Sequence, residues 1–168
     1  ISKMNTTMTC TPAGFNAKDL ITGIAIYKGI DKLSCKLTPA QWDSLTQFLQ
    51  PFALAQGQVL FTQGSSSRDL YFLESGTLLV HRADDSNSRV RIAMLGAGAV
   101  IGEGSFFSHS ARNATVEASS RVALWRLTPM RFTELSARAP LVALQLTLGL
   151  AGVMATRLLN EPKRVAIA

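Results

Sequence analysis

The stretch Asp69-Leu70-Tyr71-Phe72-Leu73-Glu74-Ser75-Gly76-Thr77-Leu78-Leu79-Val80-His81-Arg82 holds two short apolar runs on either side of a corner at Gly76. Similar runs, separated by Gly, Ser, Asn and Asp, recur from residue 52 to residue 127, and their apolar residues alternate with a period of two. Many short strands at even spacing indicate a mainly β sandwich or roll rather than a parallel sheet. The expected strands cover 59–62, 69–74, 77–82, 89–95, 99–101, 114–118 and 121–127.

Helical patterns flank this region on both sides. Thr38 is expected to cap a helix that starts at Pro39, and Gln41 completes a capping box. This helix is expected to end before Pro51. A second Thr-Pro pair predicts a helix over 129–137.

A long last helix is expected from Pro140 to about Leu159, where Asn160 and Pro162 stop it. One apolar face follows heptad spacing, so we expect a homodimer through it; the alternative is that the whole helix packs within one core. The uncharged stretch 139–156 approaches the length of a membrane span, but its Pro, Gln and Gly residues favour a buried helix. The heptad face contains Leu141, Leu144, Leu148, Ala151, Ala155 and Leu158, and the face expected to cover the roll contains Leu146, Leu150 and Val153.

The composition excludes several classes of protein. Of the 168 residues, 47% are hydrophobic and 17% are charged, which argues against a disordered or fibrous chain. Two cysteines cannot build a disulfide scaffold, and with no signal-peptide pattern a cytoplasmic location is expected. The net charge is +6, but no run of Lys and Arg is present, so we expect no nucleic-acid partner and no direct membrane contact.

The segment 102–116 carries the chemistry. Its start can form a short helix whose free amides, from Gly104 and Ser105, can bind an anion. Nine residues after Glu103, Arg112 offers a planar fork that suits two phosphate oxygens. Because a carboxylate repels phosphate, Glu103 is better suited to accept a hydrogen bond from a sugar hydroxyl. Phosphate and ribose together indicate a nucleotide.

Gly102-Glu103, followed after a gap by Arg112-Asn113-Ala114-Thr115-Val116, resembles the phosphate-binding cassette of cyclic nucleotide-binding domains. That family includes the catabolite activator and the regulatory subunit of protein kinase A. Segments 57–64 and 69–76 also resemble its first strand pairs, and the resemblance covers about 37–160. It implies a double-stranded β-helix, or jelly roll, with an N-terminal helix and C-terminal helices.

The resemblance also implies domain limits. Residues 1–36 would be an N-terminal extension, partly disordered, in which segment 18–36 forms either a short helix or a strand. The nucleotide-binding domain would occupy 37–160 and a tail 161–168. Since only eight residues follow Asn160, a helix-turn-helix is not expected.

By this resemblance, Arg112 would pair with the cyclic phosphate and Glu103 with the ribose 2′-hydroxyl. Amides of the cassette would complete the phosphate site, Ile92 and Leu95 would line the base pocket, and Thr156 or Arg157 would cap the base. The expected site contains Gly102, Glu103, Gly104, Ser105, Arg112, Asn113, Ala114, Thr115, Ile92 and Leu95.

Three positions depart from the family pattern. Ala111 stands where Pro is usual, Gly104 where a large aliphatic residue is usual, and Asn113 where Ala, Ser or Thr is common. These departures affect the rigidity of the cassette and the choice of base, but both charged anchors remain.

The expected function is therefore that of a sensor. It binds cyclic AMP, or alternatively cyclic GMP, without transforming it, and transmits a conformational change through its last helices. Either the dimer seam or a larger protein that the domain regulates would receive this change. No catalytic residue, cofactor or metal is expected: Ser105 and Ser108 lack an adjacent base, and only His81 and His109 are available as histidine ligands. The alternative is a degenerate domain that serves only for dimerisation or docking.

Overall fold

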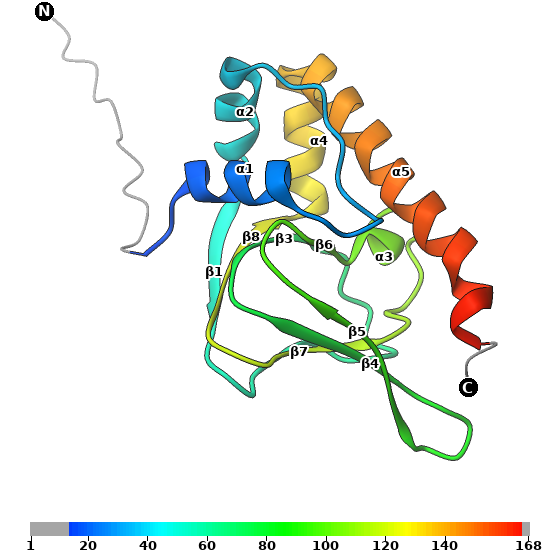
Figure 1. Ribbon diagram of the computed structural model, residues 1–168. Helices are drawn as coiled ribbons and strands as arrows, with labels where there is room; N and C mark the ends of the chain where they lie inside the picture. The colour runs from blue at the N-terminus through cyan, green and yellow to red at the C-terminus, as the bar shows by residue number, and fades with distance from the viewer. Residues whose placement is uncertain (1–13, 166–168) are drawn as a thin grey trace, which may run out of the picture.

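The computed structural model describes residues 14–165, which form two four-stranded antiparallel sheets with helices at one end (Figure 1). The first sheet has the order β1-β8-β3-β6 and the second β2-β7-β4-β5. The strands are β1 (Gln50–Leu54), β2 (Val59–Phe61), β3 (Leu70–Ser75), β4 (Leu78–Ala83), β5 (Arg89–Leu95), β6 (Val100–Ile101), β7 (Thr115–Ala118) and β8 (Val122–Leu127). This architecture confirms the prediction of a mainly β jelly roll with helices at both ends of the chain.

Strand β3 separates the two halves of the core. Alternate side chains of a strand point to opposite faces. Leu70 and Phe72 therefore pack under the helices, while Tyr71 and Leu73 fill the interior of the roll. Burial on both faces explains why this strand is a continuous apolar run.

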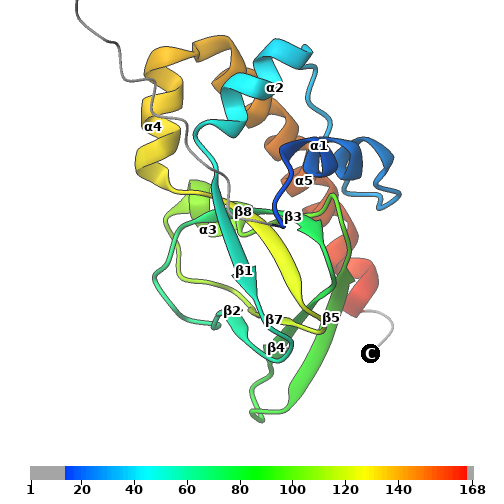
Figure 2. The same ribbon diagram turned by 90° about the vertical axis from the view of Figure 1, so that its left-hand side faces the viewer.

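Helices pack against the first sheet at β3, β6 and β8 and lie above it in Figure 2. Thr38 and Gln41 form the expected capping box, but the helix ends at Thr46, and a strand that the sequence pattern did not predict, β1, follows it. Pro51 lies inside β1, which is tolerated because β1 is at the edge of its sheet and needs fewer N–H donors. The helices are α1 (Ala17–Ile26), α2 (Pro39–Thr46), α3 (Glu103–Ser108), α4 (Pro129–Arg138) and α5 (Pro140–Val165).

The segment before α2 contains the helix α1 and packs against the rest of the domain. Leu20, Ile24 and Leu33 belong to the same core as the C-terminal helices. Buried Glu74 of β3 accepts hydrogen bonds from the backbone N–H of Asn16, at the start of α1, and from Trp125 Nε1. The domain limit expected at residue 37 thus falls between two helices of one core; residues 1–13 and 166–168 of the expected extension and tail lie outside the described residues.

Helix α5 has the two faces expected from its sequence. Leu146, Leu150 and Val153 are fully buried, whereas Leu144 and Leu148 of the heptad face are 51% and 58% exposed. The helix continues to Val165, so Asn160 and Pro162 do not end it; the proline costs the end of the helix one intrahelical hydrogen bond. The stretch Pro140–Asn160 is long and apolar enough to cross a membrane, but its inner face packs into the core of this domain.

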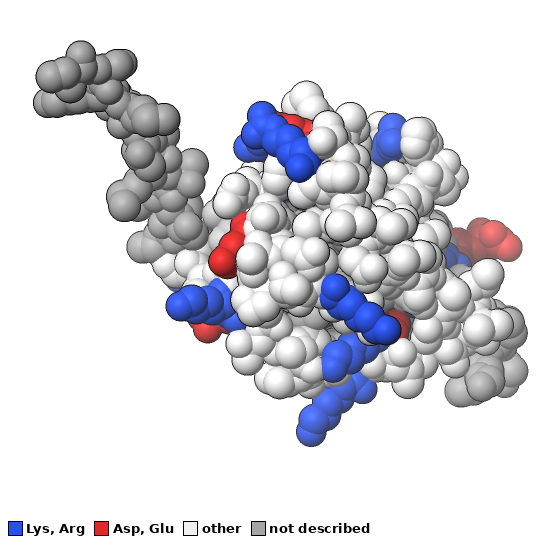
Figure 3. Space-filling view, turned by 90° about the horizontal axis from the view of Figure 1, so that it is seen from above, with Lys and Arg blue, Asp and Glu red and all other residues white. Residues whose placement is uncertain are grey.

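Charged side chains are dispersed over the helical end of the molecule. Figure 3 shows Lys and Arg there in several separate places on a largely uncharged surface. The tip of the β4–β5 hairpin is polar and exposed as expected, with Asp84 accepting hydrogen bonds from the amides of Ser86 and Ser88.

Truncation of Leu135, which α4 buries completely, tests the packing of the helical layer. We expect Leu135→Ala to lower the free energy of unfolding by about 3 kcal/mol, because it removes buried methyl groups and leaves a cavity. Met130→Ala changes a side chain of the same helix that is 78% exposed. This control should change the free energy of unfolding by less than about 0.5 kcal/mol. Equal effects of the two variants in urea unfolding would contradict this packing.

Candidate functional site

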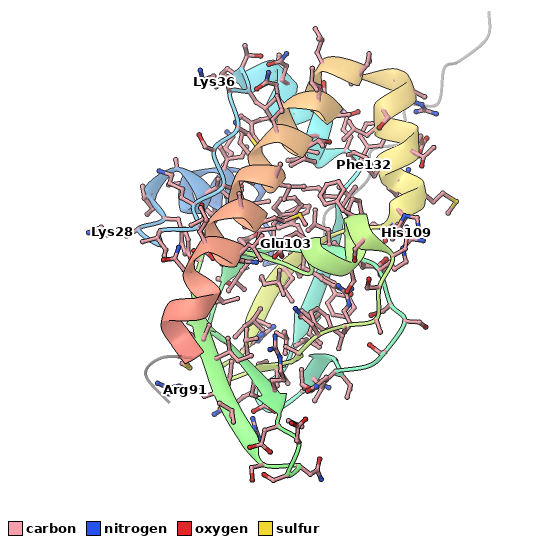
Figure 4. The ribbon with its side chains drawn as sticks, turned by 90° about the vertical axis from the view of Figure 1, so that its right-hand side faces the viewer. Lys28, Lys36, Arg91, Glu103, His109 and Phe132 are labelled. Atoms are coloured by element: carbon pink, nitrogen blue, oxygen red, sulfur yellow. The ribbon has the colours of Figure 1, made fainter. Side chains whose placement is uncertain are left out.

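A cavity of about 410 Å³ lies between the roll, the α3 region and α5. That volume is within the range of small-molecule sites, about 300–1,000 Å³. Figure 4 shows Glu103 at the start of α3, beside α5. Apolar side chains of β5 and α5, among them Ile92, Leu95, Met154 and Leu158, face polar groups of the segment 102–113 across this space.

Gly102 is required where β6 leads into α3. Its φ is +91°, in the left-handed region that favours glycine. A Cβ at this position would lie 2.6 Å from Arg112 Nη1 and 2.8 Å from the Asp69 carbonyl oxygen. The glycine therefore makes the turn and lets the guanidinium approach the backbone.

Arg112 lies at the base of the cavity and is only 2% exposed. Its Nη2 donates to the Asp69 carbonyl at 2.7 Å and its Nη1 to the Gly102 carbonyl at 3.1 Å. Its Nε donates to Ser67 Oγ at 3.0 Å, and the guanidinium stacks 4.0 Å from the centre of the Phe61 ring. All of these acceptors are neutral.

Glu103, in contrast, has a cationic partner. Its Oε2 is 2.7 Å from Nη1 of Arg157 on α5, and no described residue donates a hydrogen bond to its Oε1. Arg157 Nε also contacts Asp31 Oδ2 at 2.8 Å, and its Nη2 donates to the Val100 carbonyl at 2.8 Å. One side chain of α5 is thereby bonded to three other segments.

The buried Arg112 and the partly buried Arg157 have opposite electrostatic surroundings. Burial lowers the pKa of Arg112, and Tyr71 and Asp69 offset this effect only in part. Burial also acts to lower the pKa of Arg157, but Glu103 and Asp31 reverse the effect and raise it. Among residues 14–160, no carboxylate forms an ion pair with Arg112, so its charge is available to an anion in the cavity.

The expected site residues come together in this cavity with one exception. Thr115 does not line it; its Oγ1 accepts a hydrogen bond from the Gln63 amide instead. Of the two candidate caps, Arg157 lines the cavity, whereas the Thr156 hydroxyl donates to the Gly152 carbonyl within α5. The expected residues that line it are Ile92, Leu95, Gly102, Glu103, Gly104, Ser105, Arg112, Asn113 and Ala114.

Of the three departures from the family pattern, Gly104 and Asn113 line the cavity and Ala111 does not. A Cβ at Gly104 would meet no atom within 4 Å, and both Ala111 and Asn113 are exposed. The Asn113 carbonyl accepts a hydrogen bond from Arg82 Nε at 2.9 Å. His109 is exposed at the far end of α3, away from the cavity (Figure 4).

Sequence reasoning missed several residues that the fold brings to the site. Asp31 precedes every expected motif and reaches the cavity only because the segment after α1 packs against α5. No local sequence pattern distinguishes Asp31 as a residue of the site. The pocket also includes Phe61, Val80, Arg82, Ala93, Ile101, Val116, Met154, Ala155 and Leu158.

Comparison with known proteins places this site in a family. Residues 51–139 match the profile described as the cyclic nucleotide-binding domain. The chain is 30% identical over 107 residues to the cyclic AMP receptor protein of Thermus thermophilus, which covers 64% of this chain and 50% of the receptor. Over 66 residues, 39% of this chain and 17% of the relative, it is 36% identical to the type II regulatory subunit of cAMP-dependent protein kinase from Drosophila melanogaster.

Solved structures share the fold of this chain. A solved cyclic nucleotide-binding domain from Methylobacillus flagellatus superposes with a TM-score of 0.78 at 20% identity, covering 89% of this chain and 82% of that one. This chain spans half the length of the Thermus receptor and a smaller share of the kinase subunit. The profile match covers more than half of the 168 residues, and with it the chain belongs to the cyclic nucleotide-binding domain family.

Proposed function

We propose that this domain is a regulatory sensor that binds cyclic AMP in the cavity beneath α5, in the cytoplasm and without chemical change of the ligand. The observation that carries the proposal is the buried guanidinium of Arg112, which faces the cavity with no carboxylate partner among the described residues. A buried charge is costly unless it is paired. The phosphate of a cyclic nucleotide supplies the missing negative charge.

The remaining groups suit the rest of the nucleotide. The amides of Gly104 and Ser105 lie in the first turn of α3, where helix N–H groups have no partner within the helix and can donate to phosphate oxygens. Glu103 keeps one oxygen free to accept a hydrogen bond from the ribose 2′-hydroxyl while the other stays on Arg157. Ile92 and Leu95 offer an apolar surface to the base.

Ligand binding would be transmitted by packing between α3 and the C-terminal helices. The ring of Phe106 on α3 lies 5.4 Å from that of Phe132 on α4, and Phe107 is edge-on to both. Arg157 connects Glu103 to α5 directly. When phosphate draws α3 towards Arg112, both contacts shift the equilibrium position of α4 and α5.

We also propose that the output of this shift is read by a second copy of the chain. The exposed heptad face of α5 carries large aliphatic side chains at Leu141, Leu144 and Leu148. Ala151 follows them, whereas Ala155 and Leu158 also line the cavity. Two such faces can form a coiled-coil seam. A change in the position of α5 would then change the geometry of the dimer.

The role of Arg112 is tested by calorimetric titration with cyclic AMP. Arg112→Ala should weaken binding about a hundredfold or more, because it leaves the phosphate without its buried partner. Arg112→Lys, which keeps the charge but loses the fork, should weaken it less. Arg121→Ala, at an exposed position, is the matched control. Unchanged affinity in Arg112→Ala, with folding verified by circular dichroism, would refute the proposed site.

The role of Glu103 is tested with a ligand that lacks the 2′-hydroxyl. The wild type should prefer cyclic AMP to 2′-deoxy cyclic AMP by about tenfold, the value of one hydrogen bond to a charged group. In Glu103→Gln this preference should fall to about twofold or less. Since the comparison is made within each variant, it separates the hydroxyl contact from any general weakening of the site. If the wild type and Glu103→Gln prefer cyclic AMP to 2′-deoxy cyclic AMP equally, another residue binds the 2′-hydroxyl.

The dimer is tested by sedimentation at micromolar concentrations. Leu144→Asp places a charge in the middle of the seam and should give monomers. Met130→Asp changes an even more exposed apolar residue outside the seam and should leave the dimer intact. A monomeric wild type, or a Leu144→Asp variant that still dimerises, would contradict the proposed interface.

A further inference from the structure

We propose that Asp31, in the segment between α1 and α2, is a positioning residue of the nucleotide site: it holds Arg157, and with it α5, closed over the bound ligand and slows the ligand's release. The proposal rests on the proposed function and adds a residue outside the part of the chain that matches the family profile, residues 51–139. Asp31 lines the cavity together with Arg157 and Glu103.

The contact geometry gives Asp31 a specific task. Arg157 uses each of its three nitrogens on a different segment: Nε on Asp31, Nη1 on Glu103 and Nη2 on the Val100 carbonyl. Asp31 also accepts, through Oδ1, a hydrogen bond from the Tyr27 hydroxyl at 3.3 Å. Its side chain is only 13% exposed, so its contact with Arg157 is partly protected from solvent screening.

The segment that carries Asp31 is firmly attached on both sides. Before it, Gly23 of α1 approaches the Gly98 backbone so closely that a Cβ at Gly98 would lie 2.3 Å from the Gly23 carbonyl oxygen. After it, a Cβ at Gly149 of α5 would lie 2.7 Å from Cys35 Sγ. The first approach fixes the segment to the roll, and the second fixes it to α5 at Gly149, so a displacement of the following part of α5 would move Arg157 away from Asp31.

The closed position of α5 is compatible with a bound ligand. With Met154 and Leu158 of α5 in its wall, the cavity still has about 410 Å³. Movement of α5 away from the roll, which would widen the way out for a ligand, breaks the contacts of Arg157. The contact with Glu103 belongs to the ligand site itself, whereas the contact with Asp31 is made outside the cassette. The contact between Asp31 and Arg157 therefore stabilises the position of α5 over the cavity, in addition to the contacts that the ligand itself makes.

Two physical effects of Asp31 act in opposite directions, which makes the proposal testable. As part of the closure it slows dissociation, but as a negative charge beside an anionic ligand it disfavours association. Removal of its charge should raise the dissociation rate constant if closure dominates. If repulsion dominates, removal should raise the association rate constant and lower the dissociation rate constant.

The experiment is stopped-flow measurement with a fluorescent cyclic AMP derivative, chased with excess unlabelled cyclic AMP. Asp31→Asn, nearly isosteric, should raise the dissociation rate constant about five- to tenfold and change the association rate constant by less than about twofold. Asp43→Asn, the same change at an exposed position of α2, should change neither. Thermal unfolding without ligand verifies that the variants are folded.

A second pair of variants shows whether Asp31 acts through Arg157. In an Arg157→Ala background, Asp31→Asn should have no further effect on the dissociation rate; a full additional effect would place Asp31 in direct contact with the ligand and overturn the positioning role. A dissociation rate that Asp31→Asn leaves unchanged or lowers, in a chain whose binding depends on Arg112, overturns this inference alone. A wild type that binds no cyclic nucleotide overturns it together with the proposed function.

Discussion

The buried guanidinium of Arg112 is the constraint on which the rest of the structure depends. It joins the backbone just before β3, the turn before α3 and the loop at Ser67, all through neutral oxygens. Neutral acceptors orient the group but do not cancel its charge, so the roll carries a positive centre at the base of a cavity. The glycine at position 102 is required both by its positive φ and by the space that the guanidinium occupies.

Arg157 shows how the same residue type serves a different purpose when its partners are charged. Its carboxylate partners come from the cassette and from the segment after α1. Arg157 therefore connects α5 to these two segments and does not offer an unpaired charge to an anion. The cavity is bounded on one side by the roll and on the other by α5. In the proposed sensor a bound ligand would contact both, and a coupling between occupancy and helix position is the requirement for an output by helix movement.

Local chemistry predicted most of the fold. All expected strands are present, and the capping box and the two faces of α5 follow from side-chain spacing alone. Strand β1 was missed because Pro51 ends helices in general, and its tolerance at a sheet edge depends on tertiary structure. For the same reason Asp31 was beyond prediction, and Arg157 was expected near the base but not as the ion-pair partner of Glu103: residues distant in sequence meet only when α3, α5 and the segment after α1 pack together.

A crystal structure of the chain grown with saturating cyclic AMP tests the central claim most directly. The account predicts the cyclic phosphate within hydrogen-bond distance of Arg112, the 2′-hydroxyl on Glu103 and the base between β5 and α5, with the bonds from Arg112 to the Asp69 and Gly102 carbonyls retained. A nucleotide bound elsewhere, or a cavity that stays empty while Arg112 keeps only its neutral partners, would contradict it.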